Sequence, residues 1–258
     1  MLTIDLTGRV VLLLGGSRGI GAGITRLLCR AGARVVFTHT GDPQHAARLE
    51  ALLREVRAEG AAVEAEALDA LDGEATKALA DRIASEYGRI DGLVCNVGRN
   101  LARPPQEISD ESWRRFLDLN LTSAFYGVRA VLPHMLKARY GRIVLIGSSA
   151  VFDGGGGAID YAAAKAGMKG MMAYLCRSFT RQGILTNLIH PAVIETDLLR
   201  ERYGDEEARR GLIAQIPAGR LGKAEDIAAL TAYLLSPWGD YICGQEILAD
   251  GGRTFFNK

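Results

Sequence analysis

The sequence predicts an α/β fold in which about seven parallel strands form one doubly wound sheet with helices on both faces. Short apolar runs alternate along the chain with longer segments whose apolar residues recur at helical spacing. Runs that are apolar on both faces are typical of strands covered by helices on either side. A glycine-rich turn joins the first run to the first helical segment, as in Rossmann-type sheets. Because no linker, repeat or low-complexity tract interrupts residues 1–258, a single domain is expected.

The individual strands and helices are predicted from these two patterns, the short apolar runs and the helical spacing of apolar residues. The predicted strands are residues 10–14, 35–38, 63–67, 93–95, 143–146, 185–189 and 247–249. The predicted helices are residues 20–31, 45–59, 74–87, 110–138, 161–182 and 224–235. Right-handed crossovers would place the successive strands in one sheet.

Two segments between these elements are expected to be loops near a binding site. Residues 192–222 form the longest segment between a strand and the next helix, and their apolar members include Leu198, Leu199, Tyr203 and Ile213. Such a segment can close over a substrate, so we expect a lid, with a plain surface excursion as the alternative. The glycine run 154–157 lies between a strand and a helix and is predicted to be a mobile loop.

Composition and charge exclude several classes of partner. A formal net charge of +1 gives no reason to expect nucleic acid or an anionic membrane surface as a partner. No membrane-spanning helix is predicted, and residues 1–5 lack the pattern of a signal peptide. The four cysteines are scattered among apolar neighbours without metal-ligand spacing. We therefore expect a cytoplasmic protein with buried, reduced thiols and no metal site.

The turn after the first predicted strand has the composition of a phosphate-binding loop. Its glycines allow a tight turn and a close approach of backbone to a pyrophosphate, and the following helix offers free N–H groups. The spacing is GxxxGxG, and no Walker lysine follows, which argues against an NTPase. Dinucleotide binding is favoured. The residues expected to contact the cofactor here are Gly15, Ser17, Arg18, Gly19, Ile20 and Gly21.

Tyr161 and Lys165 are four residues apart, which puts a phenol and an ammonium group on one face of a predicted helix. A free tyrosine has a pKa near ~10, and a cation held nearby lowers it. The phenol could then give a proton to a carbonyl oxygen as hydride reaches the carbon, or take it back in reverse. Such a pair also arises by chance as a surface contact, so neighbouring residues decide the interpretation.

Two polar residues upstream support a catalytic interpretation. Ser148 follows the fifth predicted strand, at the edge of the sheet where ligands bind, and its hydroxyl could orient a substrate oxygen. Asn120 lies in an apolar part of helix 110–138, where its amide needs a partner. A water linked to Lys165 would serve as that partner. The alternative for Asn120 is an amide that only packs helices together.

These motifs resemble, in order and spacing, the short-chain dehydrogenase/reductase family over residues 7–252. The resemblance implies that Asn120, Ser148, Tyr161 and Lys165 form a catalytic tetrad, the last two also touching the cofactor. It further implies that Asp69 contacts the adenine side. Other implied cofactor contacts are Asn96 and Gly98 at the ribose region, and Pro191, Ile194 and Thr196 at the nicotinamide end.

Within the family, segments 194–197, 217–222 and 250–252 look most like the 3-oxoacyl-acyl carrier protein reductases. Arg139 falls where those enzymes carry a basic residue facing the carrier protein, whereas the second such position is Gln182, next to Arg181. The family pattern is broken at Leu14 (usually threonine), at Cys95 (usually asparagine) and at Ala192 (usually glycine). Ala192 bears on the geometry near the nicotinamide, because alanine adopts a positive φ less readily than glycine.

The end of the second predicted strand favours NADPH over NADH. Enzymes that use NAD typically place an acidic residue about 20 residues beyond the glycine turn, where it would repel a 2′-phosphate. That position is His39, and no carboxylate occurs from residue 34 to 41; Asp42 is expected to cap the following helix. Arg18 could pair with the 2′-phosphate, and His39 and Thr40 could donate hydrogen bonds to it. The alternative is that Arg18 is solvated and backbone alone holds the ribose.

Together these expectations describe an NADPH-dependent ketoreductase of a β-ketoacyl thioester, free or on an acyl carrier protein, or of a similar ketone. An NAD(P)-dependent dehydrogenase of a small secondary alcohol, sugar or steroid would share every motif. A non-catalytic dinucleotide-binding scaffold is the remaining alternative. The resemblance also implies a homotetramer that pairs helices 110–138 and 161–182. Small and methionine side chains on the second helix suit close packing: Ala166, Gly167, Met168, Gly170, Met171 and Met172.

Overall fold

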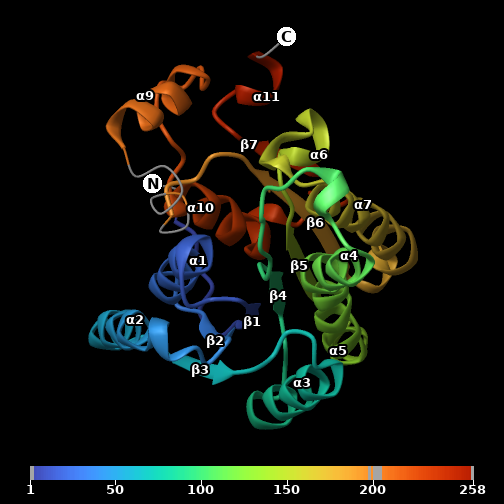
Figure 1. Cartoon of the computed structure of the whole chain (residues 1–258). Helices are drawn as coiled ribbons and strands as arrows, with labels where there is room; N and C mark the ends of the chain where they lie inside the picture. The colour runs from blue at the N-terminus through green and yellow to red at the C-terminus, as the bar shows by residue number, and fades with distance from the viewer. Residues whose placement is uncertain (1–2, 197–198, 200–204, 257–258) are drawn as a thin grey trace.

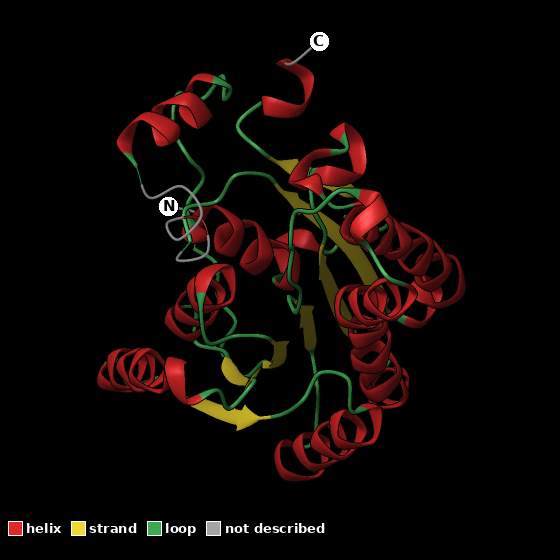
Figure 2. Ribbon diagram, in the orientation of Figure 1, coloured by secondary structure: helices red, strands yellow, loops and turns green. Residues whose placement is uncertain are grey.

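The computed structural model describes residues 3–196, 199 and 205–256. Within these residues, seven parallel strands form one sheet in the order β3-β2-β1-β4-β5-β6-β7 (Figure 1). Helices lie on both sides of the strands (Figure 2). The predicted α/β fold with one doubly wound sheet is therefore confirmed. The strand order changes direction between β1 and β4, which are neighbours in the sheet.

Each strand begins and ends within two residues of its predicted run. Every residue of β1, β4, β5 and β6 is buried, as expected for strands covered on both faces. The strands are β1 (Val10–Leu14), β2 (Arg34–His39), β3 (Val63–Ala67), β4 (Gly92–Cys95), β5 (Gly141–Ile146), β6 (Ile184–Pro191) and β7 (Glu246–Ala249).

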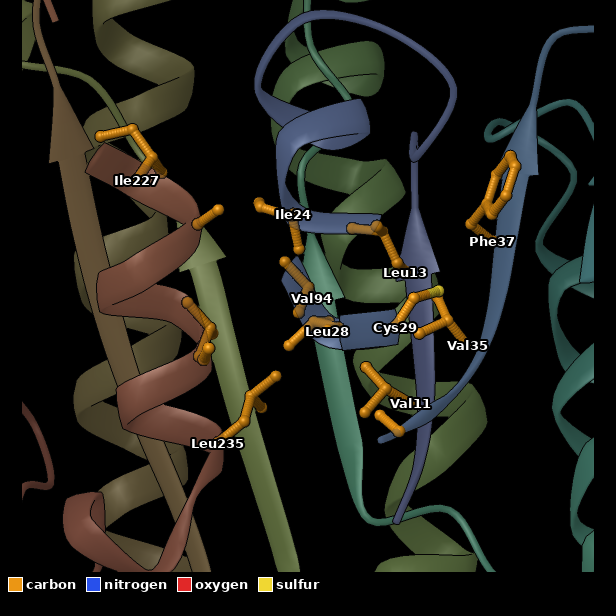
Figure 3. Packing of buried hydrophobic residues seen from close by; sticks show 14 of the residues in the cluster. Val11, Leu13, Ile24, Leu28, Cys29, Val35, Phe37, Val94, Ile227 and Leu235 are labelled. Carbon is orange, nitrogen blue, oxygen red and sulfur yellow. The ribbon is translucent and has the colours of Figure 1, made fainter. Parts of the chain in front are cut away.

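A hydrophobic core lies on each face of the sheet. Alternate residues of β1 point to opposite faces, so Val11 and Leu13 join one core and Leu12 the other. Figure 3 shows Ile24 and Leu28 of α1 packing in the first core. Helices α1 (Gly19–Arg30), α2 (Ala46–Ala58) and α10 (Ala224–Leu235) cover that core, and α3 (Gly73–Tyr87), α5 (Ser123–Ala138) and α7 (Ile159–Phe179) cover the other.

The predicted long helix 110–138 is not one regular helix, and this prediction was wrong in detail. It consists of α4 (Asp110–Leu117), one turn of π-helix (Asp118–Thr122) and α5. A π-turn adds a residue to the helical repeat, and apolar spacing alone does not reveal it. The predicted helix 161–182 begins two residues earlier, and its last three residues form a 3₁₀ turn (Thr180–Gln182).

Short helices gather at one end of the molecule: α6 (Ala150–Asp153), α9 (Glu206–Ala214) and α11 (Arg253–Phe256) (Figure 1). A guanidinium group links them, because Arg253 bonds Asp153 of α6 at 3.1 Å and Gln215, just after α9, at 3.4 Å. Helix α9 belongs to the predicted lid 192–222, of which Leu198 and Tyr203 lie outside the described residues. The remaining 3₁₀ turns are Pro43–His45, Pro105–Glu107, Gly155–Gly157 and Pro237–Gly239.

The cysteines divide into two groups. Cys29 and Cys95 are buried, as predicted, and burial raises the pKa of each thiol to about 12. Cys176 and Cys243 are only half-buried, which differs from the prediction, and their sulfur atoms lie 3.3 Å apart in a hydrogen bond. This bond joins α7 to the segment before β7. The hydrogen bonds of Cys243 with Cys176 and Thr180 lower its pKa.

Candidate active site

The carboxyl edge of the sheet brings two predicted cofactor-binding turns into contact. The Nδ2 atom of Asn96, just after β4, donates a hydrogen bond to the backbone oxygen of Gly15, just after β1, at 2.7 Å. A Cβ atom at Gly21 would collide with that same oxygen. Glycine at position 21 therefore lets α1 approach the turn, and Asn96 holds the two loops together.

The glycine turn leaves the N-terminus of α1 without a side-chain cap. Gly15 and Gly19 have φ angles of +81° and +53°, which glycine adopts without the steric cost of a Cβ atom. Arg18, the residue before α1, makes no capping hydrogen bond with its side chain. The first N–H groups of the helix, in the turn that also holds Ser17 and Ile20, therefore offer donors to a phosphate.

Arg18 lies against a histidine that the sequence analysis did not consider. Its Nη1 atom is 2.7 Å from Nε2 of His45, which belongs to the 3₁₀ turn after β2. Asp42 caps this turn by accepting a hydrogen bond from the N–H of Gln44 at 2.9 Å, as predicted. The closeness of Arg18 and His45 depends on how β2 returns beside the glycine turn, so no local pattern could reveal it.

His39 and Thr40, the other residues predicted to meet a 2′-phosphate, contact local backbone. Each accepts a hydrogen bond from the N–H two residues further on, at 3.1 Å for Nδ1 of His39 and 3.4 Å for Oγ1 of Thr40. Burial lowers the pKa of His39, so its ring is neutral at neutral pH. Asp69 likewise accepts from the N–H of Leu71 at 2.9 Å, and α3 is capped instead by Asp72.

Lys165 is buried at the carboxyl end of β5. Its side chain comes from the first turns of α7, and its Nζ atom donates a hydrogen bond to the backbone oxygen of Ile146, the last residue of β5, at 2.9 Å. Burial lowers the pKa of Lys165 to about 8. The Nζ atom is 5.9 Å from the centre of the Tyr161 ring, so the i, i+4 spacing does place both groups in one site.

Burial raises the pKa of Tyr161, and a hydrogen bond with Ser148 acts in the opposite direction. We expected Lys165 to lower this pKa below its ordinary value, and that expectation was wrong for the structure described here. At 5.9 Å from the ring, the lysine does not outweigh the loss of hydration. Ser148 thus interacts with Tyr161, and its Oγ atom also accepts a hydrogen bond from the N–H of Ala150 at 3.2 Å.

Asn120 lies in the π-turn and is fully buried. Its Oδ1 atom accepts from the N–H of Arg99, and its Nδ2 atom donates to the backbone oxygens of Arg99 and Phe116, all at 3.0 Å. Backbone groups therefore hydrogen-bond both ends of the amide, and a water that links Asn120 to Lys165 stays a prediction. A Cβ atom at Gly98 would lie 2.7 Å from Oδ1 of Asn120 and 3.1 Å from Nζ of Lys165. Gly98, Asn120 and Lys165 thus form one cluster.

The segment after β6 lies beside the glycine turn. A Cβ atom at Gly19 would be 3.3 Å from Cγ2 of Thr196, and Ile194 forms a β-bridge with Gly222. Among the described non-glycine residues only Arg139 has a positive φ, so Ala192 needs no left-handed conformation. The departure from glycine at that position is accommodated without strain.

The sequence did not predict the contact between His190 and Ser148. His190, just before Pro191 in β6, is fully buried and contacts the backbone of Ser148. Its only signal in the sequence is a polar side chain inside an apolar strand.

Comparison with known proteins agrees with this geometry. A family profile described as Enoyl-(Acyl carrier protein) reductase matches residues 15–254. The 3-oxoacyl-[acyl-carrier-protein] reductase of Escherichia coli is 36% identical over 249 residues, which cover 96% of this chain and 98% of that protein. The chain belongs to the short-chain dehydrogenase/reductase family. It is therefore an NAD(P)-dependent oxidoreductase that acts on CH–OH and C=O groups.

Other members of this family resemble the chain at similar levels. The 3beta-hydroxysteroid dehydrogenase 1 of Eggerthella lenta is 33% identical, over 98% of this chain and 96% of that protein. A crystal structure of a gluconate 5-dehydrogenase from Burkholderia cenocepacia, in complex with NADP and tartrate, is 30% identical with a TM-score of 0.88, covering 98% of this chain and 97% of that one. No described helix is long and apolar enough to cross a membrane.

Proposed function

We propose that the chain is an NADPH-dependent ketoreductase that acts on a β-ketoacyl thioester or a similar ketone. The observation that carries the proposal is the meeting of Ser148, Tyr161 and Lys165 at the carboxyl edge of β5, beside the glycine turn of β1. A bound nicotinamide supplies hydride to the substrate carbon. The glycine turn and the uncapped N-terminus of α1 fit the pyrophosphate of that cofactor.

Tyr161 is the proposed proton donor. The raised pKa keeps its phenol protonated at neutral pH, which is the form that an acid needs when a carbonyl is reduced. The proton moves from the phenol oxygen to the substrate oxygen as the carbon accepts hydride, so the ketone becomes a secondary alcohol. Ser148 binds the same substrate oxygen and keeps it directed at the phenol.

Lys165 and Asn120 support this step in different ways. With a pKa of about 8, Lys165 is largely protonated at neutral pH, and its charge stabilises the phenolate that remains on Tyr161 after proton transfer. Asn120 fixes the backbone of Arg99, next to Gly98, and so shapes the wall beside the Lys165 ammonium. We assign Asn120 as a positioning residue on this basis.

The preference for NADPH is proposed from charge. Arg18 offers a guanidinium beside the glycine turn, and His45 lies 2.7 Å from it. His39 stands where NAD-using enzymes place a carboxylate. The gluconate 5-dehydrogenase solved with NADP is a relative for which the 2′-phosphorylated cofactor is observed.

The substrate class and the assembly are proposed from similarity and exposure. The E. coli relative, whose name assigns it 3-oxoacyl thioesters on a carrier protein, is the basis for the thioester. The steroid and gluconate relatives make a secondary alcohol, sugar or steroid dehydrogenase the second candidate. We also propose a homotetramer, because Phe125 of α5 and Tyr174 of α7 are 45% and 67% exposed. Residues 192–222 are proposed to close over the substrate.

The test is a panel of β-ketoacyl thioesters, simple ketones, sugar acids and steroids, followed by the absorbance of NADPH. We expect turnover of ketones, with the thioesters preferred. Preference for sugar acids or steroids would replace the first candidate by the second. No turnover of any carbonyl or alcohol, with cofactor binding retained, would favour a non-catalytic scaffold.

A further inference from the structure

The ring of His190 lies directly behind Ser148. Its Nδ1 atom is 3.2 Å from the backbone nitrogen of Ser148, which donates to it, and 2.9 Å from the backbone oxygen. A Cβ atom at Gly147 would lie 2.6 Å from the same Nδ1 atom, so glycine is needed for the ring to come this close. The His190 ring also packs against the ring of Phe152 of α6 in a T-shaped arrangement, at 5.0 Å between ring centres.

The backbone of β6 binds the N–H groups on either side of Ser148 but not that of Ser148 itself. The N–H of Gly147 donates to Ile189 at 2.7 Å, and the N–H of Ser149 donates to Pro191 at 2.9 Å. Between them, the side chain of His190 takes the N–H of Ser148. The orientation of the Ser148 backbone at the end of β5 is therefore set by a side chain.

A carboxylate on β7 holds the other side of the ring. The Nε2 atom of His190 lies 3.2 Å from Oε1 of Glu246, a charge contact in which neither atom makes a hydrogen bond with the described residues. Lys169 of α7 forms an ion pair with Oε2 of Glu246 at 2.6 Å, which fixes the position of that carboxylate beside the ring. Nδ1 meets both backbone atoms of Ser148, so the neutral ring accepts from the Ser148 N–H when its proton is on Nε2 and donates to the Ser148 oxygen when its proton is on Nδ1.

We propose that His190 is a positioning residue for Ser148, oriented by Glu246 and Lys169 so that its Nδ1 atom fixes the Ser148 backbone and aims the hydroxyl at Tyr161. The inference rests on the proposed function of Ser148. Burial lowers the pKa of His190, which agrees with a neutral ring beside the Ser148 backbone.

The experiment is a double-mutant cycle between His190 and Ser148, with kcat and KM measured on the best ketone. His190→Leu fills the space without an acceptor, and we expect kcat to fall about tenfold, the equivalent of one hydrogen bond, with little change in KM for NADPH. In the Ser148→Ala background the same substitution should change kcat less than about twofold, because the group it positions is gone.

Two further variants make the cycle decisive. His190→Asn can place an acceptor near the Nδ1 position and should recover most of kcat. Glu246→Gln removes the orienting charge without emptying the site, and it replaces His190→Leu in the cycle if that variant does not fold. The matched control is Asn187→Ala, a buried polar residue of the same strand that bonds Ile242 and Gln245 instead. It should lower the melting temperature but leave kcat within about twofold in both backgrounds.

The outcomes separate two failures. If Ser148→Ala alone leaves kcat unchanged, the proposed function of Ser148 is wrong. If Ser148→Ala lowers kcat but His190→Leu either has no effect or has an equal effect in both backgrounds, the inference about His190 is wrong while the proposed function stands.

Discussion

The Nζ atom of Lys165 donates a hydrogen bond to the backbone oxygen of Ile146 at 2.9 Å, from a residue that is only 3% exposed. One buried hydrogen bond does not replace the hydration that an ammonium group loses. The pKa of Lys165 therefore falls from 10.5 to about 8. The positive charge that the proposed mechanism needs is held there at a cost in stability.

This cost has a defined pH dependence. Between about pH 8 and 10.5 the unfolded chain carries more protons at Lys165 than the folded one, so the stability of the wild type rises with pH in that window. Lys165→Met has no titrating group at this position and so lacks this pH-dependent change in stability. Its free energy of unfolding relative to wild type should therefore fall by about 3 kcal/mol from pH 7 to pH 10.5, as measured by urea denaturation. A difference that does not vary with pH would contradict the buried, charged lysine.

Tyr161→Phe should remove the proton donor and leave the ring in place. We expect kcat to fall by ~10²–10⁴-fold, with NADPH affinity from fluorescence titration nearly unchanged. Lys165→Ala should instead lower both kcat and cofactor affinity. Near wild-type turnover by Tyr161→Phe would show that another group donates the proton.

Arg18→Ala should affect the binding of NADPH and NADH differently. Loss of a charge-assisted pair with the 2′-phosphate would weaken NADPH far more than NADH. His39→Asp should shift kcat/KM toward NADH, because a carboxylate there repels the phosphate. Arg57→Ala, which removes an exposed charge at the end of α2, serves as the control and should alter neither cofactor. A higher kcat/KM with NADH in the wild type would overturn this interpretation of β2.

The half-buried pair of cysteines predicts selective alkylation. The hydrogen-bonded contact with Cys176 lowers the pKa of Cys243, which favours the reactive thiolate form of Cys243. Iodoacetamide at pH 7 should modify Cys243 well before the buried Cys29 and Cys95, as followed by peptide mass spectrometry. Cys176→Ala should slow the reaction at Cys243. Equal rates with and without Cys176 would show that the hydrogen bond does not control reactivity.

The exposed rings of Phe125 and Tyr174 predict the assembly. If α5 and α7 pair between copies, Tyr174→Glu should shift the sedimentation mass from tetramer toward smaller species at micromolar concentration. Arg54→Glu on α2 places a new negative charge outside that pair of helices and should leave the mass unchanged. A wild-type monomer would refute the proposed interface.

The sequence predicted the strands well, because their signal is local. A run such as residues 10–14 is apolar at every position, and burial on both faces is its direct consequence. The glycine turn was predictable for a similar reason, since three glycines at fixed spacing leave few other conformations. Tyr161 and Lys165 were predicted to share a site because helical spacing alone brings them together.

What the sequence did not predict depends on contacts between distant segments. Arg18 meets His45, and His190 meets Ser148 and Glu246, only after β2, β5, β6 and β7 have assembled. The direction of the Tyr161 pKa was missed because burial, which dominates it, is a property of the whole fold. The 3₁₀ and π-turns were missed because each alters the hydrogen bonding over only a few residues, which the apolar spacing of a long segment does not resolve.

The π-turn at Asp118–Thr122 sets the rotation of α4 relative to α5, so we expect that deletion of one residue there would disturb the packing of α4. An α-helix rotates about 100° with each residue, so deletion of Leu119 would make the helix regular and turn α4 by about that angle relative to α5. Phe116 now faces the core, and its ring supports the guanidinium of Arg103 at 4.5 Å. After the deletion that ring would point elsewhere, and its backbone oxygen would lose Asn120 as a donor. The extra residue therefore rotates α4 about the helix axis relative to α5, so that the two halves of one continuous helical segment pack against different neighbours.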